Sequence, residues 1–303
     1  MKKIGKFLLC FLPLIAFIAI QVVLGLIGGI GAGFVAGFEA GMKGMGNDVV
    51  YITQRTQEMI AIVNPIVICA CHVLAVVIGC IWVYYAFGKK KPGNPVKTFS
   101  WMTLLVIVLC AIGLQYGSSA ALGIVDKISP ALMESYNQLM ESAGLSSMNV
   151  LTLIASVCLA PIGEELLFRG VTLRYAKNAG LRFWVANIIQ AVCFGIAHLN
   201  IVQGCYAFVL GIVLGYLYEK YNSLYVPILV HFVFNLLGTV VSYVLQALLG
   251  ESIAETSEPA LISYIIALVI NAAVLALGII LIRKDKKACQ PVEDKGEGEY
   301  ATL

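Results

Sequence analysis

The stretch that decides the fold is VLTLIASVCLAPIGEELLFRG, residues 150–170. It is long enough to cross the hydrocarbon core of a bilayer, which needs about 20 mostly apolar residues. Two adjacent carboxyl groups, those of Glu164 and Glu165, nevertheless lie inside it. Because an ionisable side chain is unfavourable to bury in a membrane, such a residue marks a functional site by default. The stretch therefore predicts a transmembrane helix that carries part of a site.

The composition of the whole chain agrees with a membrane protein. Of its 303 residues, 60% are hydrophobic and 12% are charged, against about 45–50% and 25% in soluble domains. The mean hydropathy is +0.91. A water-soluble enzyme, a disordered protein and a secreted disulfide scaffold are therefore excluded. The odd number of cysteines, nine, and the net charge of +3 indicate neither a disulfide framework nor nucleic-acid binding.

Eight apolar stretches are long enough to be transmembrane helices. They are 7–37, 59–87, 101–125, 149–168, 183–199, 201–218, 224–249 and 260–282. We therefore predict an all-α membrane protein in which about eight transmembrane helices enclose a polar intramembrane cavity.

The composition divides the chain into three parts. Residues 1–148 hold an uncleaved first span, two further spans and outer loops, of which 126–148 has some amphipathic spacing. Residues 149–282 carry Glu164, Glu165, His198 and His231 inside apolar stretches. Residues 283–303 are charged and nearly free of large apolar side chains, so we expect a disordered cytoplasmic tail.

The basic residues set the orientation. Of the 20 lysines and arginines, only Lys43, Arg55 and Lys127 fall in outer segments when the N-terminus is placed inside. Because lysine and arginine accumulate in cytoplasmic segments, both termini are predicted to be cytoplasmic. The short loops and the lack of targeting segments favour a bacterial plasma membrane.

Helix geometry gives the two glutamates different roles. Adjacent residues point about 100° apart, so Glu164 and Glu165 cannot both face one site. Glu165 and Arg169 are four residues apart with the glutamate first, which is the favourable order for an ion pair. Glu164 has no such partner on its own helix and is a candidate general base. Pro161 removes the helical hydrogen bond to the carbonyl of Val157 and loosens the helix just before the pair.

The chain has only three histidines, and all of them lie in apolar spans. His198 follows Phe194 by one turn, and His231 precedes Asn235 by one turn. Two histidines, an asparagine and an unpaired glutamate on three separate spans suit a polar cavity between helices. His72 has only cysteines as polar neighbours, and we interpret it as a structural residue.

Together these residues resemble the motifs of a known family. EExxxR at 164–169, FxxxH at 194–198 and HxxxN at 231–235, in this order on successive spans, look like the three motifs of the CPBP intramembrane proteases. This family, also called Abi, includes the CAAX-prenyl endopeptidases and bacteriocin-processing proteins. The resemblance covers about residues 149–249, so 149–282 would be a catalytic transmembrane core of the CPBP type.

The resemblance implies a role for each motif position. The implied catalytic residues are Glu164, His198, His231 and Asn235, with structural support from Glu165, Arg169 and Phe194. Glu164, assisted by His198, would activate the attacking water. His231 and Asn235 would stabilise the oxyanion of the tetrahedral intermediate. Peptide hydrolysis needs both functions, a base for the water and donors for the developing charge.

The same residues leave a second chemistry open. Glu164, His198 and His231 could bind zinc and lower the pKa of a metal-bound water. The sequence has no HExxH spacing, and we favour a site without a metal.

We therefore expect an intramembrane endopeptidase that acts near the cytoplasmic leaflet, with a cavity that opens beside Leu167 and Ser223. Its partners would be the lipid bilayer and a membrane-associated peptide or protein, such as a pheromone, a bacteriocin leader or a CAAX-like sequence. No nucleic acid is expected. The second hypothesis is a non-catalytic membrane partner in bacteriocin self-immunity or sensor-kinase regulation. A proton-coupled transporter ranks third, because no inverted repeat is visible.

Overall fold

The computed structural model of the chain describes residues 3–88, 99–142, 149–241, 244, 248 and 259–288. All regular structure in these ranges is helical, which confirms the predicted all-α class. The elements in chain order are α1 (Lys3–Leu8), η1 (Leu9–Phe11), α2 (Leu12–Met42), α3 (Val49–Phe87), α5 (Trp101–Ile128), α6 (Pro130–Ser142), α7 (Val150–Leu153), η2 (Ile154–Leu159), α8 (Ala160–Glu165), η3 (Leu166–Leu173), α9 (Arg174–Asn178), α10 (Phe183–Ile196), α11 (Ile201–Tyr221), α12 (Tyr225–Leu236), η4 (Leu237–Val241) and α14 (Leu261–Ile282).

Six helices in the described ranges are long and apolar enough to cross a membrane, and the chain is a multi-pass membrane protein. They are Ile4–Met42, Val49–Phe87, Trp101–Ile128, Val150–Asn178, Ile201–Tyr221 and Leu261–Ile282. The other two predicted spans form shorter apolar helices, Phe183–Ile196 and Tyr225–Val241. The 14 residues of α10 extend about 21 Å at 1.5 Å per residue. Since the hydrocarbon core is about 30 Å thick, α10 is too short for a full crossing.

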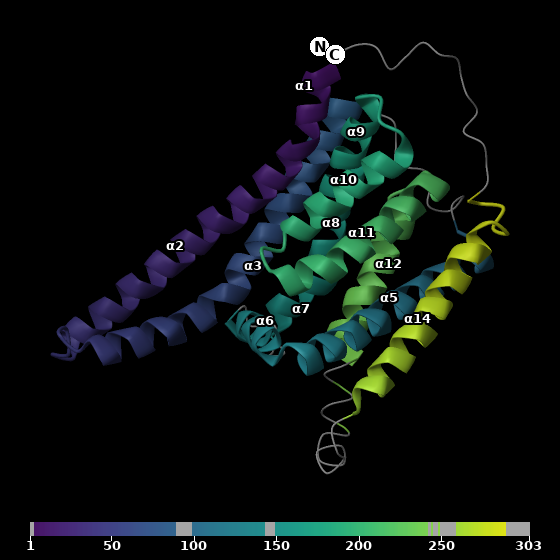
Figure 1. The fold of residues 1–303 in the computed structure, drawn as a ribbon. Coiled ribbons are helices and arrows are strands. Elements are labelled where there is room, and N and C mark those ends of the chain that lie inside the picture. The colour runs from purple at the N-terminus through teal and green to yellow at the C-terminus, as the bar shows by residue number, and fades with distance from the viewer. Residues whose placement is uncertain are drawn as a thin grey trace.

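The helices form a bundle with two different ends (Figure 1). Helices α2 and α3 pack side by side, and their connection projects away from the rest of the molecule. Helix α5 pairs with α14 on the other side. The continuous helix from α7 to α9, the hairpin α10–α11 and helix α12 lie between these two pairs. The core of the bundle is therefore built from residues 150–241.

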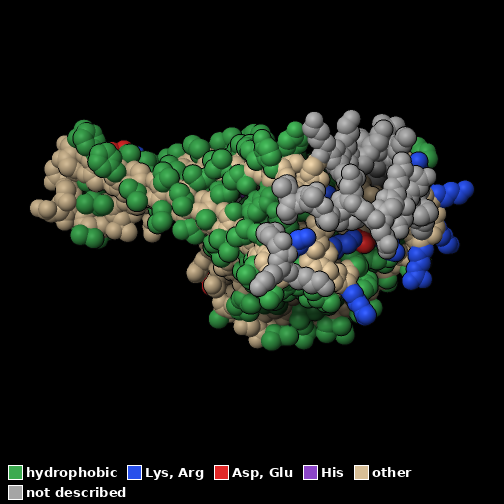
Figure 2. Space-filling model, turned by 90° about the horizontal axis from the view of Figure 1, so that it is seen from above, with side chains coloured by type: hydrophobic (Ala, Val, Ile, Leu, Met, Phe, Trp, Pro, Cys, Tyr) green, Lys and Arg blue, Asp and Glu red, His purple; other side chains and the backbone are tan. Residues whose placement is uncertain are grey.

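Basic side chains gather at one end of the bundle, which we call the basic end. Figure 2 views the molecule from this end and shows Lys and Arg side chains gathered on it. The described residues that define it are Lys6, Arg174, Lys177, Arg182, Lys220, Arg283, Lys284, Lys286 and Lys287. The opposite end holds α6, the start of α7 and the end of α5, and we call it the α6 end.

Small residues allow the central helices to approach closely. A Cβ atom built on Gly163 of α8 would lie 3.0 Å from the Cβ of Ala75 on α3. In the α10–α11 hairpin, a Cβ on Gly195 would lie 2.8 Å from the backbone oxygen of Gly204. Close backbone contact of this kind is how membrane helices gain packing without a hydrophobic driving force. These contacts fix α3, α8 and the hairpin relative to one another.

The C-terminal segment differs from the prediction at its start. We expected disorder from residue 283, but the described residues 283–288 form turns in which Asp285 is buried. Asp285 accepts hydrogen bonds from the hydroxyls of Tyr221 (2.9 Å) and Ser100 (3.1 Å). It therefore ties the end of α14 to α11 and to the start of α5. The predicted tail after residue 288 lies outside the described residues.

The close contact at Gly195 predicts a stability effect that depends on position. Gly195→Ala should lower the melting temperature, because the added methyl group meets backbone that cannot move aside; overpacking of this kind typically costs about 1–3 kcal/mol. Gly29→Ala is the matched control, since no heavy atom lies within 4 Å of a Cβ built there. It should leave the melting temperature unchanged or raise it. Equal effects of the two substitutions on thermal unfolding of the purified protein would contradict the packing described here.

Candidate active site

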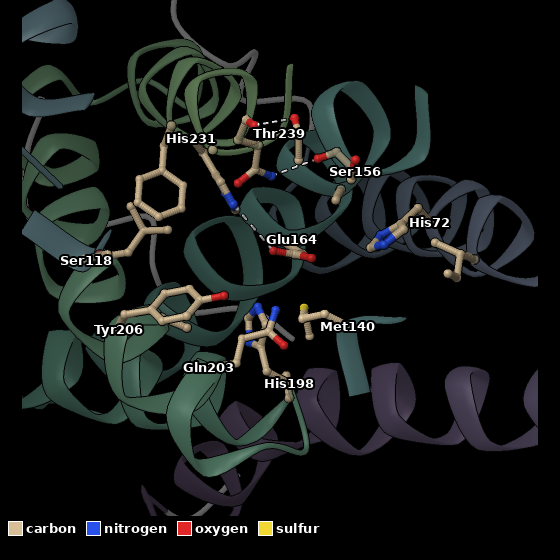
Figure 3. Close-up of a pocket in the computed structure, with 18 of the residues that line it drawn as sticks. His72, Ser118, Met140, Ser156, Glu164, His198, Gln203, Tyr206, His231 and Thr239 are labelled. Atoms are coloured by element: carbon tan, nitrogen blue, oxygen red, sulfur yellow. Dashed lines mark hydrogen bonds and ion pairs between the residues drawn. The ribbon is translucent and has the colours of Figure 1, made fainter. Parts of the chain in front are cut away.

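A cavity of about 610 Å³ lies inside the bundle and contains the predicted catalytic residues. Glu164, His198, His231 and Asn235 all line it, although they come from three separate parts of the chain. Figure 3 shows His231 and His198 on opposite sides of the central Glu164. The prediction that these polar groups share one cavity is therefore confirmed.

The position of the cavity in the bundle differs from the prediction. We expected it to open beside Leu167 and Ser223, but these residues are 0% and 2% exposed and do not line it. The lining instead includes Ser119, which is exposed near the end of α5, and Tyr136 and Met140 of α6. The physical reason is that residues 167–173 pack into the hydrophobic core and close the bundle at the basic end.

The helix that carries the two glutamates is not a regular α-helix. Segments η2 and η3 on either side of α8 are π-helical, a form that occurs mostly as short insertions and often at functional sites. In this register the backbone N–H of Ala160 bonds the carbonyl of Ala155, five residues back. The next bond in the series would run from Pro161 to the carbonyl of Ser156, and proline has no N–H to donate.

Asn235 supplies the missing hydrogen-bond donor for the carbonyl of Ser156. Its Nδ2 donates a hydrogen bond to the carbonyl oxygen of Ser156 at 2.7 Å. The sequence-based prediction placed the freed carbonyl at Val157, which assumed α-helical spacing; the π-register moves the unpaired acceptor one residue earlier. A proline in one helix and an asparagine in another thereby lock α8 to α12 at the cavity wall.

Glu165 and Arg169 form the predicted ion pair, which is confirmed. Arg169 Nη1 donates to Glu165 Oε1 at 2.7 Å, and both side chains are 0% exposed. Arg169 Nη2 also donates to the carbonyl of Gly211 on α11 at 3.3 Å. Glu165 Oε1 is in turn 3.0 Å from His231 Nδ1. Because a carboxylate accepts hydrogen bonds, His231 Nδ1 is the donor in this contact, and the ion pair fixes the ring of His231.

The other ring nitrogen of His231, Nε2, faces Glu164. His231 Nε2 lies 3.7 Å from Glu164 Oε2, and Glu164 is 6% exposed. Glu164 lines the cavity, whereas Glu165 does not. The predicted division between one glutamate in the cavity and one paired behind it therefore agrees with the structure, and His231 lies between them.

Phe194 holds the second histidine and the arginine in place. Its ring meets the ring of His198 edge to face at 4.9 Å between centroids, and the Arg169 guanidinium lies 4.5 Å from its centroid. The carbonyl oxygen of Phe194 lies 2.8 Å from His198 Nδ1. A carbonyl can only accept, so Nδ1 carries the proton of the neutral ring and Nε2 is left as an acceptor.

The arrangement of the site residues does not match a zinc centre. Among the described residues, no three His, Cys, Asp or Glu side chains lie close enough together to hold a metal ion. Nδ1 of both His198 and His231 is already engaged. The ligand set Glu164, His198 and His231 therefore does not assemble in this arrangement.

Two residues that the sequence analysis did not assign to the site line the cavity. His72 of α3 lines the cavity, and its buried Nδ1 has no hydrogen-bond partner, which argues against the structural role first assigned to it. Tyr206 of α11 also lines the cavity, with its hydroxyl 3.4 Å from that of Tyr136. His72 and Tyr206 reach the site only through the packing of the helices. In the sequence, the one weak sign of such a role is that each carries a polar atom inside an apolar span.

The segment that carries the three motifs is similar to known proteins. Residues 146–237 match the family described as type II CAAX prenyl endopeptidase Rce1-like. The curated protein "Putative membrane peptidase YdiL" of Bacillus subtilis (strain 168) is 31% identical over 87 residues, 28% of this chain and 34% of that protein. The chain thus matches about a third of that relative's length. No solved structure matches the chain significantly. The resemblance to the CPBP family is confirmed for the segment that carries the three motifs.

The buried ion pair predicts strong coupling between its members. Glu165→Gln or Arg169→Met alone leaves a buried charge without its partner and should lower the free energy of unfolding by about 3–5 kcal/mol. The double substitution should recover much of that loss. A double-mutant cycle on the purified protein measures the coupling, and strictly additive losses would show that the two residues do not interact.

Because the buried Nδ1 of His72 has no hydrogen-bond partner, we expect that replacing His72 does not destabilise the protein. His72→Leu removes a buried polar atom that has no hydrogen bond, so the melting temperature should stay the same or rise. Gln190→Leu is the comparison, because its buried amide donates to Asn187 and to the carbonyl of Gly211; its loss should cost about 1–3 kcal/mol. Equal losses in thermal unfolding would return His72 to a structural role.

Proposed function

We propose that the chain, whose residues 146–237 match CAAX-type membrane peptidases, is an intramembrane endopeptidase. One observation carries the proposal: a buried carboxylate, Glu164, faces an imidazole at 3.7 Å inside a cavity that a second imidazole also lines. An acid–base pair beside a cavity large enough for a peptide segment is what hydrolysis of a peptide bond requires.

The proton inventory of the site supports this chemistry. His231 Nδ1 donates to Glu165, so Nε2 carries a proton only when the ring is an imidazolium. With Glu165 and Arg169 paired, one proton on His231 Nε2 leaves Glu164 ionised. Two anions and two cations then cancel within the buried cluster, which a low-dielectric interior strongly favours. Glu164 is in this state a base, and the proton on His231 is a donor.

The reaction follows from these positions. A water molecule held between Glu164 and the acceptor nitrogen of His198 loses a proton to Glu164 as its oxygen attacks the scissile carbonyl carbon. The developing oxyanion accepts hydrogen bonds from His231 Nε2 and from the second hydrogen of Asn235 Nδ2, whose first hydrogen bonds Ser156. Collapse of the tetrahedral intermediate breaks the C–N bond, and Glu164 returns its proton to the leaving amine. Donors aimed at the oxyanion are often the largest single contribution to catalysis.

The substrate class follows from the surroundings of the site. The cavity lies within apolar helices, and its lining mixes apolar residues with a few polar groups. This suits a membrane-associated or hydrophobic peptide, such as a pheromone, a bacteriocin leader or a CAAX-like sequence, in a bacterial plasma membrane. A non-catalytic role as a bacteriocin-immunity or sensor-kinase partner is the alternative function, and it would tolerate loss of Glu164.

Removal of the base should abolish cleavage. Glu164→Gln keeps the shape of the side chain and removes the proton acceptor, so the rate should fall by about 10²–10⁴-fold, the usual contribution of general-base catalysis. Glu219→Gln, on the surface where Glu219 pairs with Lys177, is the control and should keep its activity. Fragments from a hydrophobic peptide library, identified by mass spectrometry, give the measurement. An active Glu164→Gln enzyme would place the base elsewhere.

Asn235 should act on the transition state. Asn235→Ala should lower kcat by about 10²–10³-fold with little change in KM, since the donor has little to bond before the oxyanion forms. Thr239→Val, in the next turn and also at the cavity, is the control. If KM rises while kcat is unchanged, Asn235 binds the substrate instead.

The zinc alternative has its own test. Treatment of the purified enzyme with a chelator should leave the cleavage rate unchanged under the metal-free proposal. Loss of activity that added zinc restores would make Glu164, His198 and His231 a metal site and overturn the proposed water activation.

A further inference from the structure

The cavity occupies the same half of the bundle in α5, in the helix from Val150 to Asn178 and in the α10–α11 hairpin. Helix α5 runs from the basic end to the α6 end and contributes Gln115, Ser118, Ser119 and Leu122, all from its second half. The helix from Val150 to Asn178 runs in the opposite direction and contributes Ser156, Ala160 and Glu164, from its first half. The hairpin α10–α11 contributes residues around its turn, which points to the α6 end. The cavity therefore extends from the middle of the bundle toward the α6 end.

The basic end of the bundle is closed. Phe168, Val171 and Leu173 are fully buried in the segment that follows the glutamates. Tyr221, Leu224 and Val226, where α11 passes into α12, are buried as well. The buried pair of Glu165 and Arg169 lies behind Glu164 on this side. These described residues therefore form a packed layer between Glu164 and the basic end.

Charge distinguishes the two ends of the bundle. Nine described lysines and arginines define the basic end, whereas Lys43, Arg55 and Lys127 are those near the other end. Basic residues close to transmembrane helices accumulate on the cytoplasmic side. The basic end therefore faces the cytoplasm, and the cavity belongs to the outer half of the membrane.

Helix α6 fits a position on the outer surface. It has no lysine or arginine, and it carries Glu134 and Glu141 on the side away from the bundle. Tyr136 and Met140 face the cavity, and the hydroxyl of Tyr136 lies 3.4 Å from that of Tyr206. An amphipathic helix without basic residues, set across the end of the bundle, forms one side of the entrance.

We propose that the site receives its substrate from the outer side of the membrane. The inference rests on the proposed function and narrows its substrate class to a hydrophobic segment that is exported or anchored with its cleaved bond in the outer half of the bilayer. Under this proposal, segments anchored in the cytoplasmic leaflet would be poor substrates. This replaces the cytoplasmic opening expected from the sequence.

Thiol accessibility tests the orientation without any need for activity. In a background with the native cysteines replaced, Ser119→Cys at the entrance and Met140→Cys on α6 should react with a membrane-impermeant thiol reagent added to right-side-out vesicles. Lys177→Cys, an exposed position at the basic end, is the matched control and should react only in inside-out vesicles. Reaction of Ser119→Cys and Met140→Cys only in inside-out vesicles would overturn the inference.

A second experiment separates this inference from the proposed function. The probe is a quenched fluorescent peptide with an apolar segment that the detergent-solubilised enzyme cleaves, added to proteoliposomes in which the labelling pattern gives the orientation. Cleavage should occur when the α6 end faces the added peptide and be lost when the basic end does. Cleavage only from the basic end overturns the inference while the peptidase stands. If the solubilised enzyme cleaves no peptide, the proposed function fails, and the labelling result still decides which way the cavity faces.

Discussion

The buried ion pair between Arg169 and Glu165 is the interaction on which the site depends. Neither side chain is exposed, and the pair lies between three helices. Arg169 reaches the backbone of α11 through Gly211 and stacks over the ring of Phe194 on α10. Glu165 accepts a hydrogen bond from His231 Nδ1 on α12. One buried pair thereby sets the positions of both motif histidines. Glu164, one residue away, faces the cavity instead.

The second constraint is the break in regular helical bonding before the glutamates. Pro161 cannot donate to Ser156, and a carbonyl without a partner is unfavourable in a membrane interior. Asn235 supplies the missing donor. Asn235 thus lines the cavity and is also held by a hydrogen bond to the backbone. Its side chain is therefore more rigid than one without such a bond. Donors fixed before the reaction need no reorganisation when charge develops, which is why such rigidity favours catalysis.

Much of this could be predicted from the sequence because membrane helices obey simple rules. The apolar stretches gave the helices, and the four-residue spacing of Glu165 and Arg169 gave their ion pair. The spacing of three motifs brought Glu164, His198, His231 and Asn235 to one cavity. Three features could not be predicted, because they depend on packing between distant segments. The π-register moved the free carbonyl from Val157 to Ser156. The burial of residues 167–173 closed the end where an opening was expected. His72 reached the cavity through the close contact of α3 with α8, for which no local pattern exists.

The central proposal is that Glu164, which lies 3.7 Å from His231 Nε2, is ionised inside the membrane and can therefore act as the base. Infrared difference spectroscopy tests this directly, since a protonated carboxyl group has a C=O stretching band that a carboxylate lacks. The spectrum of the wild-type protein minus that of Glu164→Gln, at neutral pH, should lose a carboxylate band and no protonated carboxyl band. Loss of a protonated carboxyl band would place the proton on Glu164 and contradict its role as the base.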